Sequence, residues 1–179
     1  TGYMQQSHEI AAKQLGLLRE LAPAARRIAV MFDAGNPSML QGLRNAERAG
    51  KPLGLTILPV PLRGWQDVDA ALALWLREPV DGLLVLYGLV TSNLASNIAA
   101  LTRRLRLPAV YGNRMFIFEG GLVAYGIDWS ALVEGSANYI ARILNGAKPA
   151  DLPVQQPTRF ELIVNLGFAR NLGMTIPQS

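Results

Sequence analysis

The 179-residue sequence has no cysteine and a single histidine, His8. Without cysteine the chain forms no disulfide, thiolate metal site or cysteine nucleophile. One histidine is too few for a histidine-rich metal cluster, and its place near the N-terminus speaks against a Ser-His-Asp triad. The phosphate-binding patterns GxGxxG and GxxxxGK[ST] and the nucleophile pattern GxSxG are also missing. We therefore expect a protein that is not an enzyme and that holds no metal or cofactor.

Long hydrophobic runs and clustered charges are missing as well. No apolar run reaches about 18 residues, so we expect no membrane-spanning segment. The 17 Lys and Arg residues exceed the 13 Asp and Glu residues by only four, and they are scattered along the chain. This arrangement does not support nucleic-acid binding, which needs a clustered basic face. Half of the residues are hydrophobic, so a chain of this length can bury a substantial core.

Short apolar runs alternate with helical stripes along the chain. The runs predict buried strands at 28–32, 55–60, 82–86, 108–111 and 122–125. Helices are expected between them, one capped by Thr91 and Ser92 and one running from Asp128 to Gly146. The pattern predicts an α/β fold with a doubly wound, parallel, five-stranded sheet. Beyond Gly146 several prolines mark an extended connection, followed by a strand at 160–166 and a short helix at 168–172.

A Tyr-Gly pair ends three of the expected strands, at Tyr87-Gly88, Tyr111-Gly112 and Tyr125-Gly126. Ligands of open α/β sheets bind beyond the carboxyl ends of the strands. Each glycine permits a sharp turn or a close approach, and each tyrosine offers a flat face with one hydroxyl. The three pairs predict an aromatic, weakly polar cleft for a small organic molecule. The alternative is that each tyrosine only caps the edge of the core, and the two readings stand about even.

Three further residues lie at expected strand ends and have two interpretations each. Asn36, before Pro37, reads first as the N-cap of a helix and second as a ligand contact. Asp128 is likewise first an N-cap, although its helix terminus also suits a polar ligand group. Arg114 has the geometry to hold a carboxylate with two hydrogen bonds, against the alternative of a solvated surface arginine.

Several segments, in this order and spacing, resemble the substrate-binding proteins of ABC transporters, of the tryptophan/tyrosine-binding type with the type I periplasmic-binding fold. The similarity extends over essentially the whole chain. It is carried by the opening Thr1-Gly2 and by the segments 13–23, 27–30 with Asn36-Pro37, 107–112, 120–128, 143–158 and 160–166.

The resemblance implies a two-lobed protein that holds its ligand between lobes joined by a hinge. This chain would supply a solute-binding lobe at residues 1–146 and a hinge or crossover segment at 147–179 that returns toward a first lobe. Hinge strands are then expected near Gly126-Ile127 and Gln156-Pro157. The expected cleft residues of this lobe are Asn36, Tyr87, Tyr111, Arg114, Tyr125 and Asp128.

The same resemblance implies the partners and the location. The ligand would be a small solute, with an amino acid as one candidate, and an ABC permease in the membrane would receive it. The full-length protein would be periplasmic or a membrane-anchored lipoprotein. An isolated lobe exposes the surface that the other lobe covers, which favours self-association. The alternative is the effector-binding lobe of a transcription regulator, which shares the bilobal architecture.

Overall fold

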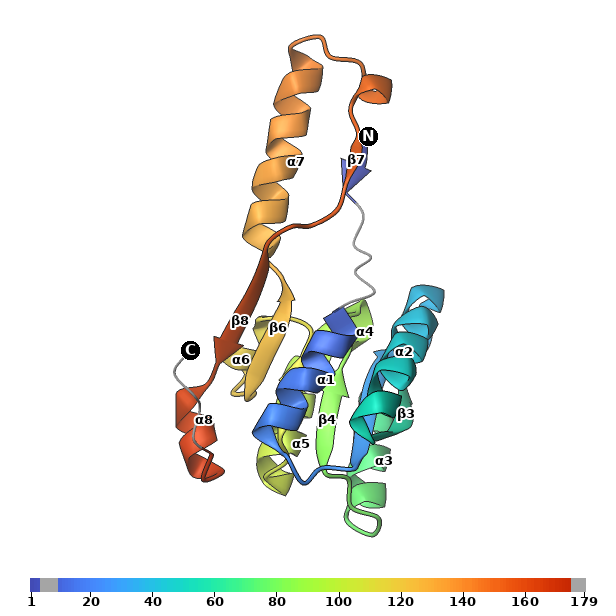
Figure 1. The fold of residues 1–179 in the computed structure, drawn as a ribbon, viewed down its shortest axis with the longest axis vertical. Coiled ribbons are helices and arrows are strands. Elements are labelled where there is room, and N and C mark those ends of the chain that lie inside the picture. Colours follow the sequence, from blue (N-terminus) through green and yellow to red (C-terminus); the bar gives the residue numbers. More distant parts are fainter. Residues whose placement is uncertain (4–9, 175–179) are drawn as a thin grey trace.

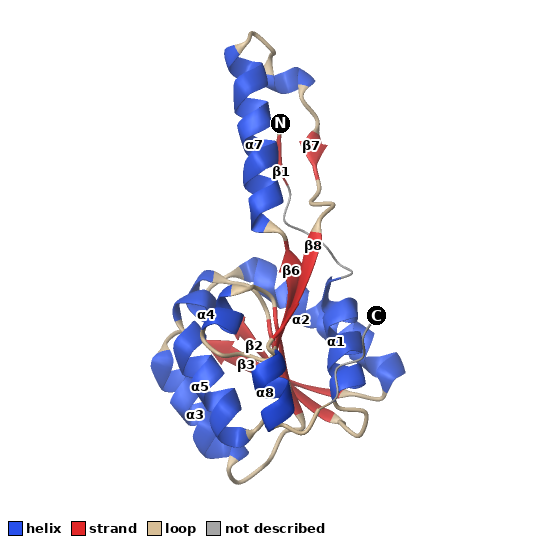
Figure 2. Ribbon diagram, turned by 90° about the vertical axis from the view of Figure 1, so that its left-hand side faces the viewer, coloured by secondary structure: helices blue, strands red, loops and turns tan. Residues whose placement is uncertain are grey.

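Apolar segments form the centre of the molecule: six of the seven residues of β2 and all four residues of β4 are buried. The computed structural model describes residues 1–3 and 10–174. Its main sheet has the strand order β3-β2-β4-β5-β6-β8. Figure 2 shows helices on both sides of this sheet. The strands are β2 (Arg27–Asp33), β3 (Thr56–Leu62), β4 (Gly82–Val85), β5 (Ala109–Tyr111), β6 (Val123–Ile127) and β8 (Phe160–Val164). Strands β2 to β6 pair in parallel, which confirms the predicted doubly wound α/β sheet.

Helices cover both faces of this sheet. Because side chains alternate along a strand, Ile28 and Val30 of β2 face one core and Ala29 and Met31 face the other. The first core is closed by α1 (Ile10–Leu21), α2 (Pro37–Gly50) and α8 (Leu166–Asn171). The second is closed by α3 (Trp65–Trp75), α5 (Ala95–Leu105) and the short α6 (Met115–Phe118). The short 3-10 helix η1 (Lys51–Leu53) extends α2.

The sheet has a sixth strand that the five-stranded prediction did not include. β8 pairs antiparallel with β6, from Val123 opposite Val164 to Ile127 opposite Phe160. A strand had been expected in this region, but the sequence gives no direct sign of its partner. The pairing is antiparallel because the chain leaves the sheet at the end of β6 and comes back from the same side.

The helix that follows β4 is interrupted. The sequence predicts one helix capped by Thr91 and Ser92, whereas the structure has α4 (Leu89–Asn93) followed by α5. Thr91 lies inside α4 and is fully buried. Its hydroxyl accepts a hydrogen bond from the Gly88 backbone N–H at 2.9 Å and lies 2.9 Å from the Leu86 carbonyl oxygen. Gly88 is therefore the N-cap residue, and Thr91 secures the turn from inside the helix.

One arm of the molecule stands away from the sheet (Figure 1). It consists of α7 (Trp129–Leu144), the 3-10 helix η2 (Pro149–Asp151) and β7 (Val154–Gln155), which pairs in parallel with β1 (Gly2–Tyr3). The expected division between residues 146 and 147 falls at the outer end of this arm. The chain leaves the main sheet after Ile127 and re-enters it at Phe160. Along the arm, α7 leaves Val133, Ile140 and Leu144 more than half exposed.

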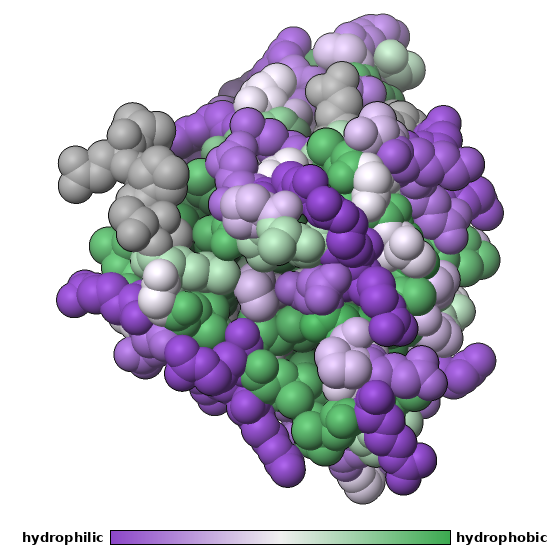
Figure 3. All heavy atoms as spheres, turned by 60° about the horizontal axis from the view of Figure 1, so that its bottom comes forward, coloured by the Kyte–Doolittle hydropathy of each residue, from purple (hydrophilic) through white to green (hydrophobic). Residues whose placement is uncertain are grey.

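Hydrophilic and apolar side chains alternate over the end of the molecule opposite the arm (Figure 3). Asp81, just before β4, lies at the start of the strands, where its Oδ2 atom accepts hydrogen bonds from the backbone N–H groups of Arg26 and Arg27, both at 2.8 Å. Both hydrogen bonds lower the pKa of the Asp81 carboxyl below its usual 3.8, and the bond from the Arg27 N–H has the larger effect. Asp81 thus ties the start of β4 to the start of β2. Within the described residues, no helix is both long and apolar enough to cross a membrane.

We expect Asp81→Ala to lower the free energy of unfolding by about 0.5–1 kcal/mol at neutral pH, since two hydrogen bonds to an exposed carboxylate are lost. A carboxyl whose pKa is lowered in the folded state contributes stability above its unfolded pKa of 3.8 and loses it as the pH falls through the lower folded value. Urea unfolding of both proteins from neutral to acid pH measures the difference. Asp69→Ala, on exposed α3 surface, is the control. A difference that persists undiminished into strong acid would contradict this role.

Candidate functional site

A pocket of ≈ 420 Å³ opens where the parallel strands end. Its wall includes Asn36 after β2, Gly88 after β4, Gly112 after β5 and Ile127 at the end of β6. The flanks come from α1, α2, α4 and the first residue of α7. This is the edge of the sheet at which an α/β fold binds ligands, because the loops there diverge and leave a crevice. The pocket therefore lies where the sequence predicts a cleft.

The glycines of the three Tyr-Gly pairs line this pocket, whereas only one of the tyrosines does. The backbone after β5 approaches both the backbone after β4 and the strand β6 so closely that no side chain fits between them. A Cβ atom added to Gly112 would lie 2.8 Å from the Tyr87 backbone nitrogen, and one added to Gly126 would collide with the Gly112 carbonyl oxygen. The pattern at the strand ends thus produces a pocket with a floor made of backbone.

Tyr87 and Trp129 form the aromatic part of the wall. Their ring centroids lie 5.3 Å apart with the planes tilted by 52°, and Tyr87 is 37% exposed. Trp129 is the first residue of α7, so the arm contributes to the pocket as well as the sheet. Sequence reasoning placed Tyr87 here and missed Trp129, which it assigned only to a helical stripe. Its place directly after the strand-end residue Asp128 is the signal that would have identified it.

Asn36 caps a helix and also lies in the wall of the pocket, so its position fits both interpretations drawn from the sequence. Its side-chain oxygen accepts a hydrogen bond from the Ser38 backbone N–H at 3.0 Å and caps α2, which begins with Pro37. The same residue lies in the wall of the pocket. Because the carbonyl oxygen of the amide is used by the cap, the amide NH₂ group is the part that suits a solute contact.

The sequence predicts Tyr111 as a cleft residue, whereas the structure places its side chain in the core and outside the wall of this pocket. Its side chain is fully buried, stacks on Phe116 with ring centroids 4.6 Å apart, and has its hydroxyl 2.8 Å from the Thr102 Oγ1 atom. Burial raises the pKa of the Tyr111 hydroxyl far above its usual 10. Tyr111 points into the core because it is the last residue of β5, and its side chain continues the alternation of that strand.

Tyr125 lies on β6 outside the wall of the pocket. Its ring stacks on Phe160 of β8, with the centroids 6.0 Å apart and the planes inclined by 17°. Its backbone carbonyl, however, accepts a hydrogen bond from the Gln14 Nε2 atom at 2.8 Å. The Tyr125 side chain therefore packs β6 against β8, and its backbone carbonyl holds Gln14, which does line the pocket.

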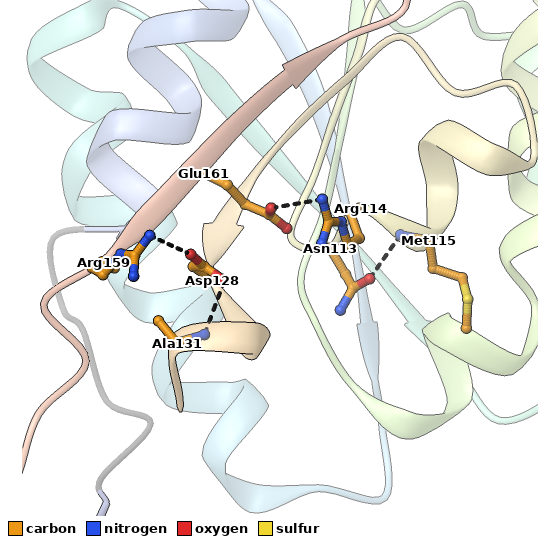
Figure 4. A network of polar contacts seen from close by, with 7 residues as sticks. All are labelled: Asn113, Arg114, Met115, Asp128, Ala131, Arg159 and Glu161. Carbon is orange, nitrogen blue, oxygen red and sulfur yellow. Dashed lines mark hydrogen bonds and ion pairs between the residues drawn. The ribbon is translucent and has the colours of Figure 1, made fainter. Parts of the chain in front are cut away.

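Arg114 and Asp128 form ion pairs beside the paired strands β6 and β8 (Figure 4). The Arg114 Nη2 atom lies 3.3 Å from the Glu161 Oε2 atom, and the Asp128 Oδ2 atom lies 3.5 Å from the Arg159 Nη2 atom. Asp128 also caps α7, because its Oδ1 atom accepts a hydrogen bond from the Ala131 N–H at 3.2 Å. It lines a second hollow of ≈ 530 Å³ between α7 and the returning segment. The structure does not bring Arg114 or Asp128 to the pocket of Asn36 and Tyr87.

Two residues in the wall that carry a buried, unpartnered polar atom were not anticipated from the sequence. Gln14 of α1 is only 2% exposed, and its Oε1 atom has no hydrogen-bond partner among residues 1–3 and 10–174. Ser92 of α4 has a buried Oγ atom that is likewise unpartnered. Gln14 interrupts the apolar stripe of α1, and this polar residue on a buried helical face was the available signal. Within residues 1–3 and 10–174, no group of three His, Asp or Glu residues is arranged to hold a metal ion.

Comparison with known proteins identifies a family and a fold. The family model described as "ABC transporter substrate binding protein" matches residues 1–179. No curated protein sequence matches significantly. A conserved domain protein from Vibrio cholerae is 21% identical, with a TM-score of 0.87 over 99% of this chain and 59% of that one. An ABC domain in complex with L-Trp from Streptococcus pneumonia is also 21% identical, with a TM-score of 0.84 over 94% of this chain and 57% of that one.

A transcriptional regulator of the LacI family from Mycobacterium smegmatis also shares the fold. It is 17% identical, with a TM-score of 0.67 over 90% of this chain and 63% of that one. The chain spans less than two thirds of each of these solved structures. At such identities the similarity establishes the type I periplasmic-binding fold, and the family model carries the information about function.

We expect Tyr111→Phe to lower the free energy of unfolding by about 1 kcal/mol without changing solute binding, because it removes one buried hydrogen bond. A hydroxyl whose pKa is raised on folding contributes stability below the unfolded pKa of 10, and this is lost as the pH rises above it. The variant should therefore lose less stability than the wild type in alkaline urea titrations. Weakened solute binding at unchanged stability would instead return Tyr111 to the pocket.

We expect Gly126→Ala to destabilise the protein by about 1–3 kcal/mol, since the added methyl group forces β6 away from the turn after β5. Gly16→Ala is a matched control in α1, where an added Cβ atom meets nothing within 4 Å. There alanine should stabilise the helix by about 0.5–1 kcal/mol. Thermal unfolding of the two variants compares them directly. Equal stability of Gly126→Ala and the wild type would show that the backbone floor is not tightly packed.

Proposed function

Because this chain belongs to the family of ABC transporter substrate binding proteins, we propose that its pocket holds a small organic solute on the way to an ABC permease in the membrane. The observation that carries this proposal is the position of the pocket. It lies at the carboxyl ends of the parallel strands and is bordered by Trp129, the first residue of the arm. A solute there contacts both the sheet and the arm, which are joined by the paired strands β6 and β8.

Binding would work through closure rather than chemistry. A solute that touches both the sheet loops and the structure around the arm favours the arrangement in which the two are close. We propose that the arm is part of a second lobe, as in a two-lobed binding protein, and that this lobe covers the exposed apolar side of α7. The solved relatives agree with this, since the chain spans 57–59% of the length of the first two. The permease would read the closed arrangement.

The two ion pairs beside β6 and β8 support the proposal that a hinge lies between the sheet and the arm. Arg114 to Glu161 joins the turn after β5 to β8, and Asp128 to Arg159 joins the start of α7 to the segment just before β8. Both lie where the chain passes between the sheet and the arm. We propose that Arg114 and Asp128 keep these passages together during closure, and that any contact they make with solute is secondary.

The proposed location is extracytoplasmic, either in the periplasm or on a lipid anchor, which is where an importer collects its solute. The LacI-type fold relative keeps the effector-binding lobe of a transcription regulator as the alternative. The DNA sequence immediately upstream of the Thr1 codon distinguishes the importer from the regulator. A secretion or lipoprotein signal followed by another α/β lobe supports the importer, and a helix-turn-helix segment supports the regulator.

An aromatic amino acid is the proposed class of solute. The tilted pair of Tyr87 and Trp129 offers flat faces of the kind that hold a ring, with polar side chains around them. The structural relative described as a complex with L-Trp shows that this fold accommodates such a molecule. L-tryptophan is therefore the first compound to test.

We expect L-tryptophan to bind this chain weakly, with a dissociation constant of about 1 mM, because one lobe supplies only part of the contacts. Trp129→Ala should weaken this binding by about 1–3 kcal/mol, the usual effect of removing an aromatic anchor. Trp65→Ala is the matched control, since Trp65 is the first residue of α3 and lies 55% exposed outside the wall of the pocket. Ligand-observed NMR measures both. Equal weakening by the two variants, or none by either, would contradict the aromatic site.

A further inference from the structure

Gln14 is the most deeply buried polar side chain in the wall of the pocket. Helix α1 packs on β4, β5 and β6 through its apolar stripe, which includes Ala11, Leu15 and Leu18. Gln14 lies on that buried stripe and is 2% exposed. A polar amide among apolar side chains lowers stability unless its hydrogen bonds are made. Its position at the pocket therefore needs an explanation beyond packing.

The orientation of the Gln14 amide is fixed by its one partner. The Tyr125 backbone carbonyl, 2.8 Å away, can only accept a hydrogen bond, so the amide must turn its NH₂ group toward it. The Oε1 atom is then left as the free end, and it is buried without a partner in the part of the chain that the structure describes. A flip of the amide would set two oxygens against each other at Tyr125. Gln14 thus offers the pocket a hydrogen-bond acceptor in a fixed orientation.

Ser92 gives a second, independent sign of a missing partner. Its Oγ atom, in α4, is buried without a hydrogen bond to any described residue, and Ser92 lines the same pocket as Gln14. A hydroxyl can donate or accept, so it adapts to the group that it meets. The described residues of the wall carry amide, hydroxyl, aromatic and aliphatic side chains, and none of them is Asp, Glu, Lys or Arg.

We propose that Gln14 is a specificity-determining residue that accepts a hydrogen bond from an uncharged N–H or O–H group of the solute, with Ser92 as an adaptable second contact. This rests on the proposed function and adds the chemistry of the solute end that enters this lobe. A carboxylate at the same place would bring its lone pairs against those of Oε1 and is disfavoured. The solute therefore enters with an amide, hydroxyl or ring N–H group foremost, and any anionic group faces away from Gln14.

The same amide links the solute to the passage into the arm. Gln14 holds the carbonyl of Tyr125, and two residues later β6 ends at Ile127 and leads into α7. A donor on Oε1 strengthens the polarity of the whole amide, including the bond from Nε2 to Tyr125. Occupation of the pocket is thereby felt by the strand on which the arm is carried.

The experiment uses two probes of the same shape, benzamide and benzoate. They differ in presenting an NH₂ donor or a charged acceptor, so the wild-type chain should bind benzamide about tenfold more tightly in NMR titrations. Gln14→Met keeps the length of the side chain and removes its acceptor, and it should abolish this preference. Gln66→Met, on the exposed side of α3, is the matched control and should retain it.

Equal binding of the two probes by the wild type, or binding of neither while L-tryptophan binds, would overturn the role of Gln14 and leave the proposed function standing. Failure of L-tryptophan and both probes would overturn the two together. If Gln14→Met does not fold, the wild-type ratio still decides, and so does the Gln14 side-chain NH₂ signal. That signal should shift with benzamide and stay unchanged with benzoate, and the reverse would contradict the proposal.

Discussion

The antiparallel pairing of β6 with β8 is the constraint on which the rest of the structure depends. All other neighbours in the main sheet are parallel, so each return needs a helix that packs on the sheet. Between β6 and β8 the chain instead travels outward along α7 and comes back through η2 and β7. The five residue pairs from Val123–Val164 to Ile127–Phe160 fix where it leaves and where it returns. The arm, its ion pairs and the position of Trp129 all follow from that register.

The pocket is shaped by close backbone approach at least as much as by side chains. Gly112 and Gly126 let the turns after β5 and the strand β6 come into contact, which leaves space above them for a solute. The aromatic pair and the amide side chains of α1 and α2 form further parts of the wall. Specificity in such a site comes from a few polar atoms in fixed orientations, because a backbone floor offers little that distinguishes one solute from another.

The sequence predicts the layers of this fold well and its side-chain directions less well. Continuous apolar runs identify the buried parallel strands, and Asn36 and Asp128 are correctly identified as caps because capping is a local property. Tyr111 shows where such a prediction fails. It is the last residue of β5 and points into the core, whereas a strand that ended one residue earlier would have left it in the turn beside the cleft. The partner of β8, and those of Arg114 and Asp128, are long-range and depend on a register that local patterns do not encode.

The chain enters the arm from β6 and returns from it into β8, and the pairing of these two strands has a mechanical consequence. A single connecting strand would allow the two parts to twist as well as bend. In a pair of hydrogen-bonded strands, with Tyr125 stacked on Phe160, one strand cannot slide along the other without breaking the register of the side chains. Any movement of the arm relative to the sheet would therefore have to keep these two strands paired. Tyr87 after β4 and Trp129 at the start of α7 are already in contact, so this aromatic pair ties the sheet to the arm a second time, at the pocket itself.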